Sequence, residues 1–543
     1  MRVEDLTTLA VQRLASAEPT RVAVQDVGGA ELTYAALHTT ALRWAQALEA
    51  ADACAGDRIG LMLPTTAGAF TVQLAVGWLG GTVVALNPLL RGRLLSRALS
   101  CTGCTVLVTD AEHWAQVAPV TDLAPDLRSV VLTDAAGPVE RADASGRESL
   151  PVLHAADLLS AAEPSPRPHP DLADIQGIIF TSGTTGPSKP VMLSHEFVLT
   201  CARRLIPGGA DAVGGAYYSP WSVGHSLGSL ALAAAVDRGV RLVLRDRFSA
   251  PQFWSDVRGF DCRTTVLVSV SAALWDTPKR SDDADNPLRY AAMTPVIRDY
   301  RAFSERFAVQ VSGLYGATEI GPVLFSSDPA HHGVAGRPAP DYECRLVDAY
   351  GAVVPDGTVG ELVVRSLNPR GLMSGYADQA TDTGNVMRDG WLRTGDLFLR
   401  EPSGDFCFQD RLKDSIRRHG RSISSYEIEA EAVAHPGVEI CAAVGVPADP
   451  TSDAPHADEE VKLFVVPKPG SDLTSPQLVE FLEGRLPRFM VPRYIDFAES
   501  LPVTADTGRP VKSALRERPN SANTYDRYAS RPAVPAASTP ISP

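Results

Sequence analysis

The sequence predicts an α/β protein with a large N-terminal domain, built of two α/β subdomains and a β-rich subdomain, and a small α+β C-terminal domain. Two observations predict this class. Short β-branched runs alternate with helical patterns over the first 330 residues, which indicates parallel or mixed sheets covered by helices on both faces. Beyond that point, Gly and Asp turns separate short strand patterns, and helical patterns return after residue 410.

The strands of the N-terminal domain are expected where the β-branched runs lie, at residues 105–110, 129–134, 175–180, 240–246 and 264–270. The most apolar segment, residues 74–90, has paired glycines and an Asn-Pro near its end. This composition favours a buried helix followed by a buried strand over a membrane span.

The later part of the chain predicts a β-rich unit over residues 342–366, a helix from Ser425 to about Ala434, and an amphipathic helix over 475–486. The boundaries that follow are an N-terminal domain at 1–409 and a C-terminal domain at 410–516. Residues 517–543 are rich in Pro, Ala and Ser, and are predicted to be disordered.

Composition narrows the classes of function. The chain has 543 residues and a net charge of −14, which speaks against nucleic acid or an anionic membrane as a partner. Its eight cysteines are sparse, and the only CxxC, at Cys101 and Cys104, lacks a second ligand pair for zinc. The start of the chain has no secretory pattern. We therefore expect a cytoplasmic protein in a reducing setting.

The segment "TSGTTGPSKP", residues 181–190, directly follows the apolar strand pattern "IQGIIF". Backbone N–H groups and hydroxyls of such a loop can surround phosphate oxygens, and a lysine supplies the countercharge. The GxxxxGK[ST] pattern does not fit at Ser188 and Pro190. Taken alone, the segment is equally compatible with a flexible turn.

Six motifs in a shared order resemble the adenylate-forming superfamily of acyl-CoA synthetases, peptide-synthetase adenylation domains and luciferases. They are "TSGTTGPSKPVMLSH", "LYGATE", "GWLRTGD", "DRLKDSIRRHGRSISSYEIE", "LPRFMVPRYIDF" and "LPVTADTGRPVKSALR". The resemblance covers about residues 30–530. Segments such as "LNPLLRGRLL" and "RFSAPQFWSDVR" are most similar to the carnitine/crotonobetaine–CoA ligase branch.

The resemblance implies an ATP- and Mg²⁺-dependent enzyme. Glu319 would bind Mg²⁺, Thr318 would touch the α-phosphate, and Asp396 would bind the ribose with Arg411 nearby. Tyr315 and Gly316 would border the adenine. The loop that would hold the β- and γ-phosphates consists of Thr181, Ser182, Gly183, Thr184, Thr185, Gly186 and Lys189.

The resemblance also implies that the small C-terminal domain is mobile and rotates at a hinge near Lys413, for which a solvated surface lysine is the alternative. Gly420 would let the pantetheine arm of CoA pass close to the backbone. His225 would line the acyl and CoA tunnel. The family's GGxP element is altered to "AMTP", so Met293 and Thr294 are expected to shape the acyl pocket.

Two departures concern the chemistry. The catalytic lysine of the family's closing motif is replaced by Arg509, which keeps the charge but is planar and bidentate, while Lys512 matches the second lysine. Pro190 removes one N–H just after Lys189 and is expected to stiffen the loop.

The function that these features favour is adenylation of a small carboxylic acid, which could be an aryl acid, followed by transfer to CoA. A carrier protein or an amine stays open as the acceptor. One alternative is a diazotase that activates nitrite for an aminoaryl acid. Another is a degenerate nucleotide-binding homologue. A third is a serine hydrolase, because "GHSLG" fits the GxSxG pattern around Ser226, with His331 downstream.

Overall fold

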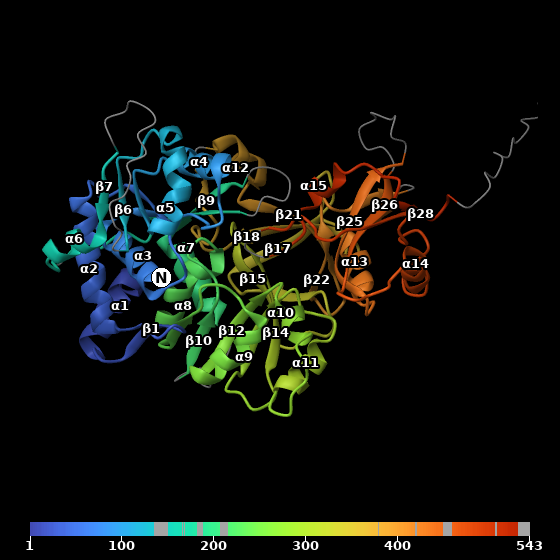
Figure 1. Ribbon diagram of the computed structural model, residues 1–543, viewed down its shortest axis with the longest axis horizontal. Helices are drawn as coiled ribbons and strands as arrows, with labels where there is room; N and C mark the ends of the chain where they lie inside the picture. The colour runs from blue at the N-terminus through green and yellow to red at the C-terminus, as the bar shows by residue number, and fades with distance from the viewer. Residues whose placement is uncertain are drawn as a thin grey trace, which may run out of the picture. The chain divides into compact units, whose positions relative to one another are not determined.

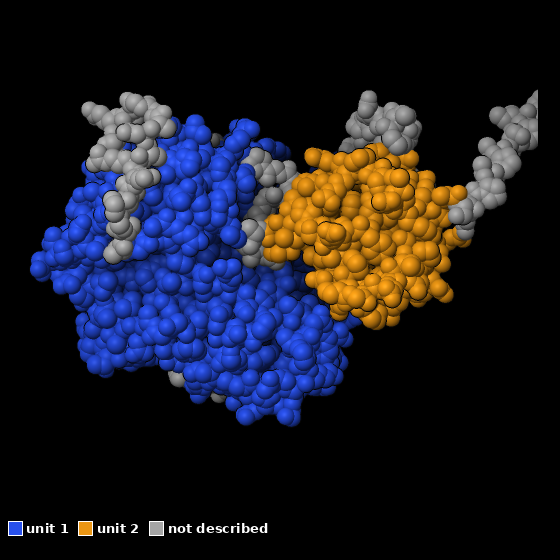
Figure 2. Space-filling model, in the orientation of Figure 1, with its two compact units in different colours: residues 1–394, 398–408, 505–507 blue, residues 395–397, 409–504, 508–543 orange. Residues whose placement is uncertain are grey.

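The computed structural model describes residues 1–134, 150–165, 167, 169–181, 188–206, 215–377, 379–418, 421–448, 459–504 and 508–529. The chain divides into two compact units, which Figure 2 colours separately. Among the described residues, unit 1 comprises 1–394 and 398–408, and unit 2 comprises 395–397, 409–504 and 508–529.

An eight-stranded sheet in unit 1 contains the two strands, β8 and β9, between which the predicted phosphate loop lies in the sequence. Figure 1 shows this sheet with helices around it. Six of its strands are parallel neighbours, and β9 and β19 extend it in antiparallel pairing. In spatial order the strands are β19 (Gly375–Tyr376), β9 (Pro190–Ser194), β8 (Ile175–Phe180), β4 (Thr82–Ala85), β3 (Arg58–Met62), β5 (Val106–Thr109), β6 (Ser129–Leu132) and β7 (Val152–His154).

Helices cover both faces of this sheet, because its central strands are apolar on both sides. Val83 and Ala85 of β4 belong to one buried core cluster, and Val84 belongs to another. The elements that contribute to the first cluster include α2 (Tyr34–Ala50) and α3 (Ala67–Leu79), and those of the second are α4 (Gly92–Cys101), α5 (Ala111–Val117) and η2 (Ala118–Leu123). The predicted helix followed by a strand over 74–90 is confirmed by α3 and β4.

A larger sheet of fourteen strands has a parallel part and an antiparallel part. The parallel part consists of β1 (Val22–Asp26), β11 (Arg241–Leu244), β10 (Ala216–Ser219), β12 (Cys262–Val268), β13 (Tyr290–Thr294) and β14 (Gln310–Ala317), with β2 (Glu31–Thr33) at its edge. The antiparallel part consists of β15 (Gly321–Ser326), β16 (Val334–Pro338), β22 (Phe406–Arg411), β21 (Trp391–Arg400), β18 (Gly360–Ser366) and β17 (Tyr342–Val347), with β20 (Met387–Arg388) beside β21.

The core of the parallel part also has two sides. One side includes residues of α1 (Thr7–Ala17), α7 (His195–Leu205) and α8 (Ser226–Arg238). The other side includes residues of α9 (Ala250–Gly259), α10 (Ser271–Trp275) and α11 (Tyr300–Phe307). The remaining helices of unit 1 are η1 (Val3–Asp5), α6 (Ala155–Ala161) and α12 (Ala380–Val386). The expected strands and the α/β class are thus confirmed.

Unit 2 is a small α+β unit. Its four-stranded sheet has the order β25 (Val438–Pro447), β26 (Glu459–Pro467), β27 (Tyr494–Phe497) and β28 (Tyr525–Asp526), and a separate hairpin joins β23 (Ile416–Arg418) to β24 (Arg421–Ile423). Its helices are α13 (Ser425–Val433), α14 (Ser475–Glu483) and α15 (Lys512–Arg516). No helix in the described parts of the chain is long and apolar enough to cross a membrane.

The prediction of disorder after residue 516 is wrong for residues 517–529. Tyr525 packs against the core of unit 2, and β28 pairs with β27. The Asp526 carboxylate lies 3.3 Å from the Arg493 guanidinium. A few specific contacts therefore order a polar segment whose composition alone predicts disorder. Residues 530–543 lie outside the described residues.

Candidate active site

The two ends of the predicted phosphate loop lie side by side in unit 1. Strands β8 and β9 form an antiparallel hairpin in which Phe180 pairs with Pro190. Beyond that pair, the Thr181 N–H donates to the Lys189 carbonyl at 3.1 Å, and the Lys189 N–H donates to the Thr181 hydroxyl at 3.3 Å. The other predicted loop residues, Ser182, Gly183, Thr184, Thr185 and Gly186, lie outside the described residues.

Pro190 is the first residue of β9, a position at which proline is tolerated in a sheet. Its carbonyl accepts a hydrogen bond of 2.8 Å from the Ala377 N–H. The residue after the lysine is therefore held from both sides, by Phe180 of β8 and by the segment that follows β19. Lys189 thus directly precedes the first residue of β9.

Glu319 lies in the turn between β14 and β15, and its carboxylate is held by a tyrosine from another strand. The Tyr376 hydroxyl donates to Glu319 Oε1 at 3.0 Å, and the Met373 N–H donates to the Glu319 carbonyl at 2.9 Å. Burial, and next the Glu319 charge, raise the pKa of Tyr376 far above its usual range. The phenol therefore keeps its proton and serves as a fixed donor to the carboxylate.

The same tyrosine connects Glu319 to the phosphate-loop lysine. Lys189 Nζ lies 4.9 Å from the centre of the Tyr376 ring and 3.2 Å from Asp382 Oδ2. We call these four side chains the Glu319 cluster: Glu319, Tyr376, Lys189 and Asp382. The structure thus brings together two predicted residues, Lys189 and Glu319, that are far apart in the sequence.

Sequence reasoning missed Tyr376 and Asp382. Tyr376 lies 57 residues after Glu319 and reaches it because β19 pairs with β9, which also positions Lys189. The only local signal is Gly375, whose φ of 118° is a backbone conformation that favours glycine.

The "LYGATE" motif is shaped by a close approach of two strands. A Cβ on Gly316 would lie 2.4 Å from the Gly321 carbonyl oxygen on β15, so only glycine fits there. The Tyr315 ring meets the edge of the Phe398 ring at 4.8 Å between centres. Thr318 lies in the turn directly before Glu319. The motif therefore presents Thr318 and Glu319 at the end of a tightly packed strand pair.

His225 lies at the N-terminus of α8. Its ring nitrogen Nδ1 accepts a hydrogen bond of 3.1 Å from the Leu227 N–H, and its ring stacks on Trp221 at 4.8 Å. The Nδ1 acceptor role fixes the tautomer of a neutral His225, with the proton on Nε2. The structure thus gives His225 a fixed orientation at a helix start.

The glycines of "GHSLG" are explained by packing. A Cβ on Gly228 would lie 1.8 Å from the Ser222 carbonyl oxygen, and one on Gly224 would lie 3.0 Å from that of Leu86. Ser226 is the first residue of α8. Both ring nitrogens of His331 have other partners, at 2.8 Å from Glu401 Oε1 and 2.7 Å from the His332 carbonyl. This geometry does not support a hydrolase.

Met293 and Thr294 lie on opposite faces of β13, because side chains alternate along a strand. Met293 is fully buried and packs in the core with α9 and α11. Ala292, on the same face as Thr294, packs in the core that contains Tyr315. The structure therefore places Thr294, and not Met293, on the face of β13 that is shared with Tyr315.

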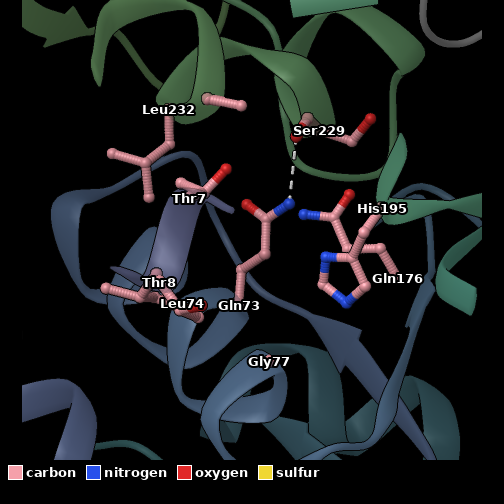
Figure 3. A pocket seen from close by; sticks show the side chains of 10 residues that line it. Thr7, Thr8, Gln73, Leu74, Gly77, Gln176, His195, Ser229 and Leu232 are labelled. Atoms are coloured by element: carbon pink, nitrogen blue, oxygen red, sulfur yellow. Dashed lines mark hydrogen bonds between the residues drawn. The ribbon is translucent and has the colours of Figure 1, made fainter. Parts of the chain in front are cut away.

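Ser194 and His195, which follow the loop, have structural roles. The Ser194 hydroxyl accepts from the Phe197 N–H at 3.1 Å and caps α7. His195 lines a small cavity together with the Gln73 side chain (Figure 3). Burial lowers the pKa of His195 to about 4, so the ring is neutral at physiological pH.

This cavity has room for about one water molecule. Gln73 Nε2 donates to the Ser229 carbonyl at 3.0 Å, whereas Gln73 Oε1 and the Thr8 hydroxyl have no hydrogen-bond partner among the described residues. The cavity volume that the centre of a water molecule can occupy is about 20 Å³. That volume suits one water molecule with several polar partners.

Asp396, Arg411 and Lys413 lie close together in unit 2. The Arg411 Nε lies 3.7 Å from Asp396 Oδ1, and the Leu412 N–H donates to the Gly395 carbonyl at 2.8 Å. Burial, and next the Arg411 charge, lower the pKa of Lys413 to about 8. The folded environment thus stabilises the charged form of Lys413 less than water does. Gly420 lies outside the described residues.

Lys512, the second lysine of the closing motif, belongs to a buried network. Its ammonium lies 2.8 Å from Glu429 Oε1 and donates to the Ser425 hydroxyl at 2.6 Å. Ser425 in turn donates through its N–H and hydroxyl to Asp410. The network fixes the start of α13 to the residue that precedes Arg411.

Arg509 is positioned by the backbone of a short hairpin in unit 2. Its N–H donates to the Thr504 hydroxyl at 3.2 Å, its carbonyl accepts from the Thr504 N–H at 2.8 Å, and Val503 bridges to Pro510. Arg509 and the Asp396 group thus belong to unit 2, and the Glu319 cluster belongs to unit 1.

Two family models match this chain. Residues 11–377 match the model described as AMP-binding enzyme, and residues 427–507 match the AMP-binding enzyme C-terminal domain. Feruloyl-CoA synthase of an Amycolatopsis species is 32% identical over 532 residues, which cover 95% of this chain and all of the relative. Sulfoacetate–CoA ligase of Cupriavidus necator is 30% identical, with 87% and 90% of the two chains covered.

Solved structures show the same fold. An anthranilate CoA ligase in complex with anthranoyl-AMP superposes with a TM-score of 0.81 at 22% identity, covering 95% of this chain and 98% of that one. The o-succinylbenzoate CoA synthetase of Bacillus subtilis, in complex with ATP and magnesium, gives a TM-score of 0.78 at 20% identity, covering 94% and 99%.

Proposed function

This chain belongs to the AMP-binding enzyme family, and we propose that it is an ATP- and Mg²⁺-dependent, AMP-forming ligase that adenylates a small carboxylic acid and passes the acyl group to CoA. The relatives named as a CoA synthase and a CoA ligase cover 95% and 87% of this chain, and the C-terminal family model matches residues 427–507. We place the enzyme in the cytoplasm, where ATP and CoA are available.

The observation that carries this proposal is the Glu319 cluster. It joins the predicted metal carboxylate to the lysine of the phosphate loop through one tyrosine, with contacts of 3.0 and 4.9 Å. A carboxylate next to an ammonium at the end of a sheet is suited to a magnesium–phosphate complex. A degenerate nucleotide binder would have no need to keep Glu319 and Lys189 in this arrangement.

Three side chains of the cluster, those of Glu319, Tyr376 and Lys189, have separate tasks in the proposed reaction. Glu319 would hold Mg²⁺, which neutralises phosphate charge when bound. Tyr376 orients the carboxylate, and Lys189 faces the β- and γ-phosphates. A carboxylate oxygen of the acid attacks the α-phosphorus and pyrophosphate leaves. The CoA thiol then attacks the acyl carbon and AMP leaves.

One observation favours a second candidate, an ATP-dependent diazotase that activates nitrite. Arg509 stands where the family has its catalytic lysine, and its backbone is fixed on both sides by Thr504. A planar guanidinium can hold two oxygens of a small anion at once, which suits nitrite as well as a carboxylate. The CoA-ligase relatives favour the first candidate.

Isotope exchange between pyrophosphate and ATP tests the proposal, because it reports the adenylation step alone. We expect exchange that depends on an added acid, with aryl and small aliphatic acids as the panel. Arg509→Ala should reduce it by about a hundredfold or more, since a cation at the α-phosphate acts mainly on the transition state. Arg509→Lys should retain it. Exchange that requires nitrite, and that Arg509→Lys abolishes, would instead establish the diazotase.

A further inference from the structure

Three potential metal ligands meet at the surface of unit 1, outside the candidate active site. They are His331 from the segment between β15 and β16, Glu401 from the turn between β21 and β22, and Cys407 from β22. The His331 nitrogen, the Glu401 carboxylate oxygen and the Cys407 sulfur all lie within 4.8 Å of one another. His331 Nε2 is 2.8 Å from Glu401 Oε1.

We propose that His331, Glu401 and Cys407 form a binding site for a zinc ion. Imidazole, carboxylate and thiolate are the three ligand types that proteins offer to Zn²⁺, and three protein ligands leave a fourth position for water. Tetrahedral zinc separates its ligand atoms by roughly 3.3–3.5 Å. The observed separations therefore need side-chain shifts of only about 1 Å.

The surroundings of His331 support this assignment. Its Nδ1 lies 2.7 Å from the His332 carbonyl, so Nδ1–H donates to the backbone and Nε2 is directed at Glu401. A backbone carbonyl on the far nitrogen is the partner that orients metal-binding histidines in proteins. Zinc on Nε2 leaves the Nδ1–H bond to the His332 carbonyl in place, so the ring keeps this orientation.

The position of the thiol also fits a site that fills from solution. Cys407 is only 3% exposed, whereas the His331 side chain is 46% exposed and that of Glu401 is 27% exposed. An ion would thus enter past the histidine and carboxylate and reach the thiol beneath them. Binding converts the Cys407 thiol to a thiolate, and the proton goes to solvent.

The turn that carries Glu401 is well ordered. The Gly404 N–H donates to the Glu401 carbonyl at 2.8 Å, and Arg337 of β16 donates to the Ser403 carbonyl at 2.7 Å and to Asp405 at 3.1 Å. The ligands therefore come from segments that are already fixed to each other. Zinc would add a link between the β21–β22 turn and the segment that precedes β16.

Titration of the full-length, metal-free protein with cobalt(II) chloride tests the site, because a cobalt–thiolate bond gives a charge-transfer absorption band in the near ultraviolet. We expect one equivalent of cobalt to produce the band, and zinc chloride to remove it by displacement. Cys407→Ser should abolish the band. His331→Ala and Glu401→Gln, both at the surface, should weaken cobalt binding at least about tenfold.

Two matched variants serve as controls. His332→Ala removes the adjacent histidine, and Cys54→Ser removes an exposed thiol that lies 3.2 Å from the Asp57 carboxylate. Both should keep the band. The proposal is overturned if no band forms, if Cys54→Ser removes it, or if His331→Ala and Glu401→Gln bind cobalt as tightly as the wild type. His331→Ala and Glu401→Gln change surface side chains, so they test the site even if Cys407→Ser fails to fold.

Discussion

At the scale of single residues, the Tyr376 phenol and the Asp382 carboxylate each contact one of the two predicted functional side chains of the Glu319 cluster. Tyr376 holds the Glu319 carboxylate at 3.0 Å, and Asp382 holds the Lys189 ammonium at 3.2 Å. The first contact orients a proposed metal ligand. The second contact pairs Asp382 with the lysine that is proposed to face the phosphates, so Asp382 competes with phosphate for this cation. The two neighbours should therefore affect catalysis in opposite ways.

Glu319→Gln should reduce the rate of pyrophosphate release by a factor on the order of 10² or more while the fold is kept, because the metal carboxylate is lost. Tyr376→Phe should reduce it less, by roughly tenfold, since the carboxylate stays and only its orientation is relaxed. Steady-state kinetics at varied Mg²⁺ measures both. Equal rates for Glu319→Gln and the wild type would reject the metal role.

Asp382→Asn should lower the KM for ATP a few-fold, because it removes a negative charge that competes with phosphate for Lys189. Lys189→Ala should raise the same KM, and the double variant should resemble Lys189→Ala. The measurement is the initial rate at varied ATP. A KM that rises in Asp382→Asn would show that this carboxylate helps to bind the nucleotide.

Lys413 should make stability depend on pH. Its pKa is about 8 in the folded protein and near 10.5 when unfolded, so below pH 8 both states are charged and the folded state carries the cost of a buried charge. Between pH 8 and 10.5 the unfolded chain binds more protons, so stability rises with pH.

Lys413→Met should therefore be more stable than the wild type at pH 7, by about 1 kcal/mol after screening is allowed for. This advantage should shrink as the pH approaches 10.5. Urea unfolding at both pH values measures it, with the exposed Lys468→Met as control. An advantage that does not change with pH would contradict the account.

At the scale of elements, helix packing explains the two glycines of the pattern "GHSLG". The N-terminal turn of α8 lies so close to Ser222 that no side chain fits at Gly228. His225 caps the same helix end. The spacing of the two glycines thus follows from how α8 meets the preceding loop, and needs no nucleophile.

Gly228→Ala should lower the free energy of unfolding by roughly 2–3 kcal/mol, because its Cβ would meet a backbone oxygen that has little room to move. Ser226→Ala should change it by less than about 0.5 kcal/mol and leave pyrophosphate release at the wild-type rate. Thermal unfolding and a coupled pyrophosphate assay check the pair. Loss of activity in a stably folded Ser226→Ala would restore a catalytic role for this serine.

Elements with strong local patterns could be predicted from the sequence. β-branched runs predict β8 and β12, an apolar stretch predicts α3, and the structure contains all three. Local patterns are informative here because the strands are buried on both faces.

The partners within the site could not be predicted in this way. The Tyr376–Glu319 contact joins β19 to the turn between β14 and β15. The position of β19 depends on its tertiary pairing with β9, and no periodicity in the chain marks it. The order of residues 517–529 likewise depends on one strand pair and on Arg493, which composition does not reveal.

At the scale of the whole molecule, the predicted functional residues divide between two units. Unit 1 holds the Glu319 cluster, and unit 2 holds Arg509 and the Asp396 group. The roles that we propose for each set cover only part of the adenylation reaction. The account therefore requires that both units take part in one reaction.

The most direct test of this account is mass spectrometry of the products formed by the full chain from ATP, Mg²⁺, CoA and a panel of small and aryl acids. The account predicts AMP, pyrophosphate and the CoA thioester of at least one acid, and an acyl-AMP when CoA is left out. A parallel reaction replaces CoA with nitrite and an aminoaryl acid. AMP and a diazo product formed only in that reaction, with no acyl-AMP from any acid, would contradict the account.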